Sequence, residues 1–462
     1  MKDALSADDT SGARPLYAVT EETLGSWLDG MSSEVRAWVQ ANDFKGKPGS
    51  SLILPSADGA IAGVLCGIST PADIWDLGGL ALSLPDGSYL LGGVAADDPK
   101  AAGTLVLGWI LGAYKFRTYK KDGRKPARLV PPKGVDLALV EALAEATYMV
   151  RDLINTPAND MGPTALAEAA KELAARFGAD YAEVVGERLL EENYPAVHAV
   201  GRAAADAPRI VELTWGDSSK PTVALVGKGV CFDTGGLDIK PASGMKLMKK
   251  DMGGAAHVLG IAHVLMALKA DIHLKVLIPA VENSISGNAM RPMDIVSTRA
   301  GLTIEVANTD AEGRIILSDA LARAGEASPE MIFDFATLTG AARVALGTEL
   351  PALFCNNDAL ADALLASGTA VQDPLWRLPL WPGYRKMIEG STADINNAPE
   401  GGYAGAITAA LFLEKFVDAK TPWVHIDVMA YNRSSQAGRP EGGEAMGMRA
   451  VANLILERFG KG

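Results

Sequence analysis

The sequence is poor in histidine and cysteine. Its 462 residues contain five histidines and three cysteines, which are Cys66, Cys231 and Cys355. The cysteines are far apart and match neither a zinc-site nor a disulfide spacing, which favours a reducing, cytoplasmic setting. Because histidine and thiolate ligands are scarce, any metal ion in this protein is expected to be held mainly by oxygen atoms.

Long apolar runs and an excess of positive charge are missing as well. No run of about 18 residues is free of polar interruption, so no membrane span is predicted. The first residues are acidic and lack the apolar core of a signal peptide. The 43 lysines and arginines are outnumbered by 56 aspartates and glutamates, which gives a net charge of −13. Such a field repels nucleic acid on average, so nucleic acid is not an expected partner.

The length of the chain allows more than one domain, and 48% hydrophobic residues suffice for a large core. Residues 1–130 mix short strand-like and helical pieces, and they predict a smaller N-terminal α/β domain. The basic, proline-containing segment 120–133 and a helical pattern over 135–155 predict a connector and a linking helix, assigned to 131–155. Residues 156–462 are expected to form a larger catalytic domain.

Strands and helices alternate in this larger part. Helices are expected over 255–268 and 315–324, and strands over 221–226, 274–279, 302–307 and 331–335. The alternation predicts an α/β fold with a mixed, mostly parallel central sheet flanked by helices. Ligands of such sheets bind beyond the carboxyl ends of the strands. The loops 227–240, 279–294 and 308–314 are therefore the places to look for a site.

The first of these loops reads "GKGVCFDTGGLDIKP" from Gly227. It lacks both the ending of a phosphate-binding loop and the third glycine of a dinucleotide fingerprint, so nucleotide binding is not favoured. It holds Lys228, Asp233, Asp238 and Lys240 among glycines. Further on, Asp251 precedes the helix expected at 255–268, where the helix dipole alone would favour an acidic residue.

The third loop contains "NTDAEGR", with Asp310, Glu312 and Arg314. Residues i and i+2 of an extended or turning backbone point to the same side. Helix capping explains one acidic residue but not two. Two adjacent carboxylates repel each other unless a cation lies between them. A pair of divalent ions about 3.5–4 Å apart would resolve this repulsion. Oxygen ligands suit Zn, Mn or Mg, and the spacing does not choose among them.

Several segments resemble the leucyl (cytosol) aminopeptidase family, whose members are di-metal exopeptidases. They are "NTPANDMGPTALA", "VGKGVCFDTGGLDIKP", "MKKDMGGAA", "NTDAEGRI" and "DFATLTGA". Their order and spacing fit the family over 150–345, whereas residues 1–130 match only loosely.

The resemblance implies a site for two divalent metal ions, Zn or Mn with Mg or Co as further options. Its ligands would be Lys228, Asp233, Asp251, Asp310 and Glu312, with Asp233 and Glu312 bridging the ions. A lysine binds metal only when neutral, and burial beside two dications would lower the pKa of Lys228.

The same resemblance implies the reaction. A metal-bridging water would attack the scissile carbonyl of a peptide with a free N-terminus and release its first amino acid. Lys240 would neutralise the developing oxyanion, and Arg314 would hold a bicarbonate ion that acts as general base. The substrate would be bound by Met248, Thr337, Leu338 and Gly340. Similar proteins assemble as homohexamers.

One segment departs from the family pattern. "HIDVMAYN" at 425–432 stands where family members often have His-Leu-Asp-Ile-Ala-Gly. Because this strand contributes to the side-chain pocket, Met429 and Ala430 leave the preferred first residue open. Ile315 also replaces a leucine that usually follows the arginine of the signature.

The sequence leaves two alternatives to the aminopeptidase. Another two-metal hydrolase, such as a phosphoesterase, usually carries histidines that are absent here, and it gives Lys228 no role. A non-enzymatic scaffold or nucleic-acid-binding homologue of the same fold would be expected to have lost Lys240 or Arg314, and both are present.

Overall fold

The computed structural model describes residues 2–6, 12–93, 96–120 and 123–460. The chain forms two compact units. The smaller comprises Met1–Tyr148 together with Ser434–Glu441, and the larger comprises Met149–Arg433 and Gly442–Gly462. Helix α5 (Leu137–Asn155) therefore begins in the smaller unit and ends in the larger one.

The smaller unit is built on a five-stranded sheet. Its strand order is β2-β3-β1-β4-β5, and only the β2–β3 pair is antiparallel. The strands are β1 (Arg14–Val19), β2 (Ser51–Pro55), β3 (Ile61–Gly67), β4 (Ser88–Gly93) and β5 (Arg128–Val130). The helices are α1 (Leu24–Asp29), α2 (Ser33–Ala41), α3 (Leu80–Ser83) and α4 (Pro99–Gly112). Helix α4 begins where Asp98 accepts a hydrogen bond from the amide of Lys100, with proline in its first turn.

The larger unit is built on a nine-stranded sheet, in the order β15-β14-β17-β13-β8-β10-β7-β6 with β9 paired to β10. Its central strands β8 (Thr222–Gly227), β10 (His273–Asn283), β13 (Met331–Ala336) and β17 (Trp423–Asp427) are parallel. The others are β6 (Asp180–Val185), β7 (Arg209–Trp215), β9 (Gly229–Asp233), β14 (Ala352–Cys355) and β15 (Trp376–Arg377). β6, β7 and β14 make antiparallel pairs, so the sheet is mixed and mostly parallel.

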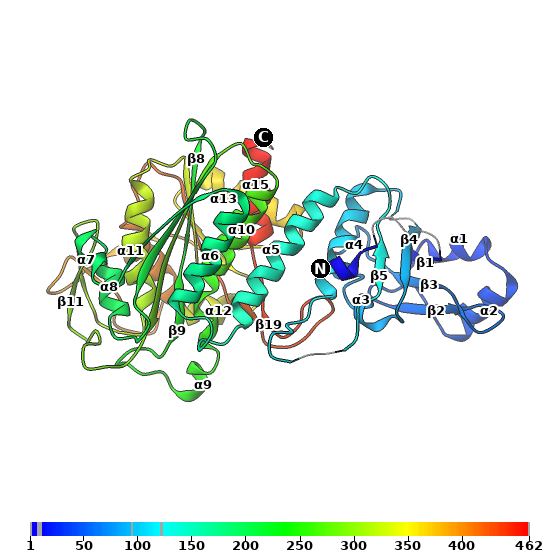
Figure 1. The fold of residues 1–462 in the computed structure, drawn as a ribbon, viewed down its shortest axis with the longest axis horizontal. Coiled ribbons are helices and arrows are strands. Elements are labelled where there is room, and N and C mark those ends of the chain that lie inside the picture. The colour runs from blue at the N-terminus through cyan, green and yellow to red at the C-terminus, as the bar shows by residue number, and fades with distance from the viewer. Residues whose placement is uncertain (1, 7–11, 94–95, 121–122, 461–462) are drawn as a thin grey trace. The chain divides into compact units, whose positions relative to one another are not determined.

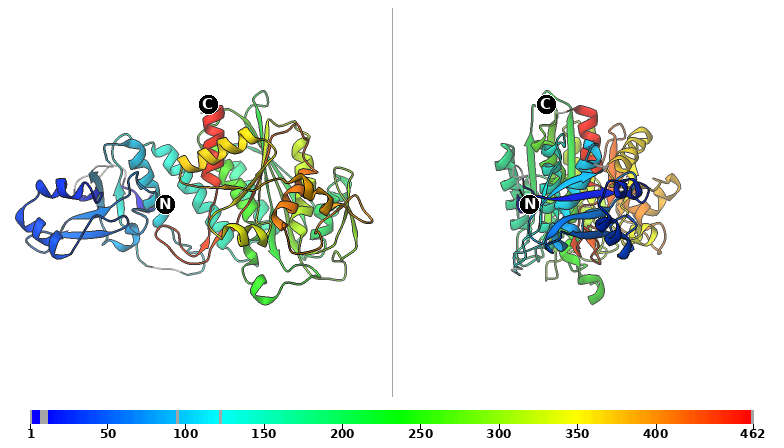
Figure 2. Two further views of the ribbon diagram at one scale, coloured as in Figure 1. Left: turned by 180° about the vertical axis from the view of Figure 1, so that it is seen from behind. Right: turned by 90° about the vertical axis from the view of Figure 1, so that its right-hand side faces the viewer.

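Helices cover both faces of this sheet (Figures 1 and 2). One group comprises α6 (Pro163–Phe177), α10 (Gly253–Ala267), α13 (Asp358–Ala370) and α15 (Met448–Phe459). The other comprises α8 (Pro195–Gly201), α11 (Glu312–Gly325) and α14 (Gly405–Glu414). The central strands are buried between them, as the continuous apolar run of β8 indicated. The predicted fold class, a smaller N-terminal α/β unit and a larger one with a mixed sheet flanked by helices, is confirmed.

The strands that follow β8 in the sequence are added to the sheet first on one side of β8 and then on the other. From β8 it passes through α10 to β10 on one side, and later through α11 to β13 on the other. A crevice beyond the carboxyl ends of the strands is expected at such a switch point. Lys228 follows the last residue of β8 and Thr337 follows the last residue of β13.

One predicted strand lies elsewhere. The segment 302–307 was expected to continue the central sheet, but its strand β12 (Thr303–Glu305) belongs to a separate three-stranded sheet. Its partners are β11 (Ile295–Ser297) and β16 (Ile395–Asn396). Alternation of residue types indicates a strand but does not specify which edge it joins. Helix α11 also starts three residues earlier than expected, at Glu312.

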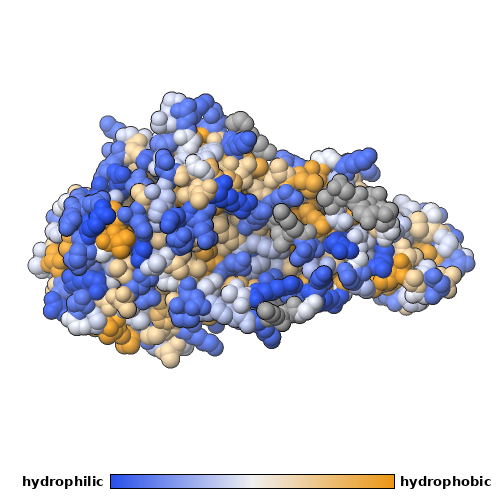
Figure 3. Space-filling view, viewed as in Figure 1, coloured by the Kyte–Doolittle hydropathy of each residue, from blue (hydrophilic) through white to orange (hydrophobic). Residues whose placement is uncertain are grey.

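On the face seen in Figure 3, apolar residues form small patches separated by polar and charged ones. Within the described part of the chain, no helix is both long enough and apolar enough to cross a membrane.

Candidate metal centre and active site

The site lies where the central strands end. The amide of Lys228 donates to the carbonyl of Phe335 at 3.0 Å, and the carbonyl of Lys228 accepts the amide of Ala255 at 2.9 Å. These bonds fix Lys228 between β13 and α10, with its side chain 3% exposed. A buried lysine at this edge is thereby aimed at the loops that carry the acidic residues.

Three carboxylates from two segments converge beside it. Oxygen atoms of Asp233, Asp310 and Glu312 lie within 4.8 Å of one another. Asp233 ends β9, Asp310 lies in the loop before α11, and Glu312 begins α11. Asp233 and Glu312 are buried and Asp310 is half-buried. Among the residues that the structure describes, the buried Oε2 of Glu312 has no hydrogen-bond partner.

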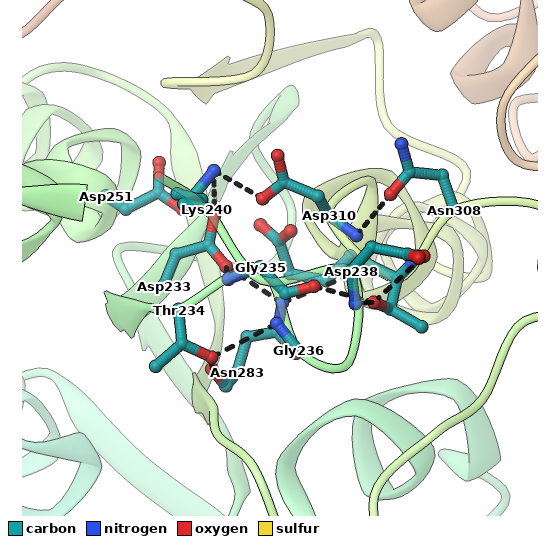
Figure 4. Close-up of polar contacts among 12 residues, drawn as sticks. Asp233, Thr234, Gly235, Gly236, Asp238, Lys240, Asp251, Asn283, Asn308 and Asp310 are labelled. Carbon is teal, nitrogen blue, oxygen red and sulfur yellow. Dashed lines mark hydrogen bonds and ion pairs between the residues drawn. The ribbon is translucent and has the colours of Figure 1, made fainter. Parts of the chain in front are cut away.

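Two lysines lie among these carboxylates. The Nζ of Lys228 is 2.7 Å from Oδ2 of Asp251 and 2.9 Å from Oε1 of Glu312. The Nζ of Lys240 is 2.8 Å from Oδ2 of Asp233 and also contacts Oδ1 of Asp310, as Figure 4 shows. All five residues predicted as metal ligands, together with Lys240, are thus brought into one connected cluster.

The cluster has more negative than positive charge. Burial, followed by the charge of Asp233, raises the pKa of Glu312 to about 8 and that of Asp310 to about 6. Burial would lower the pKa of Lys228, but the charges of Asp251 and Glu312 outweigh it and raise that pKa. The prediction of a neutral Lys228 concerns a centre with dications bound, and it stays a prediction.

These residues fit a pair of divalent cations. The cluster contains four carboxylates and only two ammonium groups. The buried Oε2 of Glu312 makes neither a hydrogen bond nor an ion pair with any described residue. Divalent ions would relieve the repulsion that raises the pKa of Glu312. Oxygen donors with one nitrogen suit Mn, Zn or Mg and do not single out one of them.

The cluster is held in place by residues that the sequence did not single out. Asn283, at the end of β10, donates from Nδ2 to Oδ1 of Asp233 at 2.8 Å and to the carbonyl of Thr309 at 3.1 Å. The hydroxyl of Thr309 in turn accepts the amide of Asp238 and donates to the carbonyl of Gly235. These partners are 26 to 74 residues apart, so no local pattern could reveal them.

Arg314 lies two residues beyond Glu312 on α11 and is buried. Its Nη1 donates to the carbonyl of Asn397 at 2.7 Å, while its Nε has no partner among the described atoms. Burial lowers the pKa of Arg314 to about 10. It therefore remains a cation at neutral pH, with a donor available for an anion.

The predicted substrate residues lie on two segments beside the cluster. Met248 is in the short 3₁₀ helix Met248–Met252, which also carries Asp251. Thr337 donates to Oδ1 of Asp251 at 2.7 Å. Leu338 follows it, and Gly340 begins the short helix α12 (Gly340–Leu346). A side chain at Gly340 would meet no atom within 4 Å, so the space in front of it is open.

Asp427 fixes the conformation of the segment that carries Leu338 and Gly340. Its Oδ1 accepts the amide of Leu338 at 2.9 Å, and its Oδ2 accepts the amide and the hydroxyl of Thr339 at 3.0 and 2.6 Å. Asp427 ends β17, so this strand fixes the start of α12. Sequence reasoning gave Asp427 no role, although it lies in the quoted 425–432 segment.

The segment that departs from the family pattern lies next to the segment that carries Asp251. Met429 and Ala430 are both buried. Ala430 has a φ of 57°, in the left-handed region that favours glycine. A Cβ on Gly253, two residues after Asp251, would lie 2.5 Å from the Cβ of Ala430.

Lys250 is a further buried cation. It is 2% exposed and lies next to Asp251. Burial, and after it the charge of Arg343, lowers the pKa of Lys250 to about 7. No motif in the sequence assigned a role to this lysine.

Comparison with known proteins agrees with this geometry. Residues 148–452 match the model of the cytosol aminopeptidase family catalytic domain, and residues 14–132 match that of the M17 aminopeptidase N-terminal domain. A probable cytosol aminopeptidase of Rhizobium meliloti is 42% identical over 78% of this chain and 76% of its own length.

Two solved structures are similar over nearly the whole chain. The cytosol aminopeptidase of Coxiella burnetii is 45% identical, with a TM-score of 0.95, over 99% of this chain and 100% of the other. The bottromycin maturation enzyme BotP in complex with Mn is 34% identical, with a TM-score of 0.87, over 97% of this chain and 100% of the other. The chain therefore belongs to the M17 cytosol aminopeptidase family and is a hydrolase of the aminopeptidase class.

Proposed function

We propose that this chain releases the N-terminal amino acid of peptides, using two divalent metal ions held at the carboxyl edge of its larger sheet. The observation that supports it best is the convergence of Asp233, Asp310 and Glu312 around two lysines, of which one is buried and the other half-buried. A non-enzymatic scaffold or a nucleic-acid-binding homologue is not favoured, because Lys240 and Arg314 both lie in or beside this cluster.

The proposed ligands are Lys228, Asp233, Asp251, Asp310 and Glu312, with Asp233 and Glu312 shared between the ions. When bound, two divalent cations would supply Lewis acidity toward the scissile carbonyl and lower the pKa of a water molecule. Manganese is supported by the complex of BotP with Mn, and zinc, magnesium and cobalt remain alternatives.

The side chains around the ions would orient and stabilise the reacting groups. Lys240 already contacts two of the carboxylates, so its ammonium is in place to stabilise negative charge developing on the carbonyl oxygen. Arg314 has a buried guanidinium with an unpartnered Nε among the described atoms, which suits the predicted bicarbonate ion as a proton acceptor.

Substrate alignment would fall to the segments that carry Met248 and Thr337. Leu338 and Gly340 would lie along the peptide, and the open space in front of Gly340 would take the first side chain. The free N-terminal amine of the substrate would distinguish it from internal peptide bonds, since an amide nitrogen is not basic.

The test is an assay of chelated protein on aminoacyl-amide substrates, with Mn, Zn, Co or Mg restored one at a time. Chelation should abolish turnover and one or more of the metals should restore it. Acetylation of the amine of the substrate should abolish turnover in the metal-loaded protein. Equal cleavage of free and acetylated substrates would contradict the exopeptidase assignment.

We also propose assembly into homohexamers, a cytoplasmic location, and a functional division into 1–130, 131–155 and 156–462. Resemblance to the family supports the first, and the names of the relatives together with three buried, unpaired cysteines support the second. Sedimentation of the metal-loaded protein would measure the assembly state.

A further inference from the structure

The loop that carries Asp310 has no regular structure of its own. Residues 306–311 join strand β12 to helix α11 and belong to neither a helix nor a strand. Peptide groups outside helices and sheets form their hydrogen bonds with side chains or with water. The side chains that bond this loop therefore determine where Asp310 stands relative to Asp233 and Glu312.

One residue supplies four of these bonds. Asn397 is completely buried, and its Oδ1 accepts the amides of Ala307 and Asn308 at 2.8 and 3.2 Å. Its Nδ2 donates to the carbonyls of Asn308 and Ala311 at 2.7 and 3.3 Å. An asparagine side chain carries both an acceptor and a donor, so it can bond both kinds of peptide group. These bonds hold the loop on both sides of Asp310.

Three further side chains bond the remaining peptide groups around the middle of the loop. Asp238 accepts the amide of Thr309 at 2.8 Å, and Asn283 donates to the carbonyl of Thr309 at 3.1 Å. The side chain of Asn308 accepts the amide of Asp310 at 2.8 Å (Figure 4). These three residues lie in the loops at the site or at the end of a central strand, so they are part of the site itself.

The small three-stranded sheet brings Asn397 to the loop. Strand β16 pairs in parallel with β12, so the chain leaves both strands at the same edge. Asn397 directly follows β16, and its amide donates to the carbonyl of Glu305, the last residue of β12, at 3.1 Å. Because β12 pairs here and not in the central sheet, an asparagine lies beside the loop that follows β12.

The same residue also bonds Arg314. The backbone carbonyl of Asn397 accepts Nη1 of Arg314 at 2.7 Å. A substitution of the side chain keeps this carbonyl, so the bonds to the loop can be removed while the partner of Arg314 is retained. The side chain of Asn397 can therefore be tested separately from the residue proposed to hold bicarbonate.

Resting on the proposed two-metal aminopeptidase, we propose that Asn397 is a positioning residue for the metal ion that Asp310 ligates. The proposed ligands have two ends, since Lys228 contacts Asp251 at one end and Lys240 contacts Asp310 at the other. Asn397 bonds the loop at the Asp310 end, so its loss weakens the binding of one ion and spares the other.

The experiment titrates Mn into chelated protein and measures binding by isothermal titration calorimetry. The wild type should bind two ions per chain. Asn397→Ala removes all four side-chain bonds, so it should bind one ion with wild-type affinity and the other about 10–100-fold more weakly. Turnover of leucyl p-nitroanilide should then need correspondingly more Mn to reach its half-maximal rate. At saturating Mn, the KM for this substrate should equal the wild-type value.

A matched control and a second variant complete the design. Asn396→Ala is the control, because this neighbouring asparagine accepts the amide of Ala398 at 2.8 Å, outside the metal-binding loop, and both affinities should stay unchanged. Asn397→Asp keeps the size of the side chain but replaces its donor by an oxygen, which the carbonyls of Asn308 and Ala311 repel. It should weaken the same ion, and it tests the proposal where Asn397→Ala fails to fold.

The outcomes separate this proposal from the proposed function. Selective weakening of one ion in the folded Asn397 variants, with the control unchanged, supports the positioning role. Wild-type affinities for both ions, or equal weakening of both, overturn it. Failure of both Asn397 variants to fold would assign the residue to overall stability and overturn it as well. A wild type that binds no pair of ions, or shows no metal-dependent turnover, would instead contradict the proposed function.

Discussion

At the scale of single residues, Glu312 is the most constrained group of the candidate centre. One of its oxygens contacts Lys228, the other has no partner among the described atoms, and its pKa is raised to about 8. The next residue must be small, because a Cβ on Gly313 would lie 2.5 Å from the Cε of Lys228. The signature "AEG" therefore combines a proposed ligand with the space that the neighbouring lysine needs.

Replacing Glu312 with glutamine tests its proposed bridging role. Glutamine keeps the shape but loses the negative charge, so the protein should take up less metal and lose activity by at least about 100-fold. Metal content measured by mass spectrometry and turnover should fall together. Full activity at wild-type metal content would refute the role.

Ala430 and Gly253 are expected to depend on each other. Gly253→Ala would bring two Cβ atoms within 2.5 Å, and overpacking of this kind costs about 1–3 kcal/mol. Ala430→Gly removes one of these atoms and relieves the left-handed φ of 57°. Urea unfolding of both single variants and the double variant should show a smaller cost of Gly253→Ala in the Ala430→Gly background. Additive costs would contradict a direct contact.

At the scale of elements, helix α10 supports the strands whose ends carry the site. Its residues 253–266 are all buried, and it packs against β8 and β13, from whose ends Lys228 and Thr337 project. Its histidine, His257, is fixed in the neutral form. Nδ1 lies 2.6 Å from the carbonyl of Gly253 and must carry the proton, while Nε2 accepts the amide of Met446 at 2.9 Å.

Because of His257, we expect the folded protein to lose stability in mild acid. Burial lowers the pKa of His257 in the folded state below its ordinary value of 6.5. The unfolded chain then binds more protons than the folded chain once the pH falls below that value. The free energy of unfolding should therefore decrease as pH falls from about 6.5, by up to about 1.4 kcal/mol per unit. His257→Gln should show a weaker dependence between pH 7.5 and 5.5 in urea titrations, and an unchanged dependence would refute the assignment.

The sequence allowed the type of most elements to be predicted, because local patterns determine it. The apolar run of β8 and the helical pattern of α11 both correspond to observed elements. The sheet joined by β12 was predicted wrongly, because pairing with β16 depends on residues about 90 positions away. The proposed ligands were found through short motifs, whereas Asn283 and Asp427 act through distant contacts that no motif records.

At the scale of the whole molecule, all the proposed metal ligands belong to the larger unit. A ligand that binds only the folded state stabilises it by about 2.7 kcal/mol at 100 times its Kd. Adding Mn or Zn to chelated protein should therefore raise the unfolding temperature of the larger unit and leave that of the smaller unit nearly unchanged. Differential scanning calorimetry would measure both, and equal shifts of every transition would contradict the expectation.

Residues 434–441 belong to the smaller unit, although the residues on either side of them belong to the larger one. This affects how the enzyme can be divided into fragments. A cut after residue 148 does not separate the two units, because the second fragment keeps eight residues whose surroundings are in the first. The flanking strands β18 (Tyr431–Asn432) and β19 (Gly442–Gly443) pair with each other, so the chain ends on either side of this excursion are adjacent. A stand-alone catalytic fragment should therefore be designed with a short turn joining these two strands.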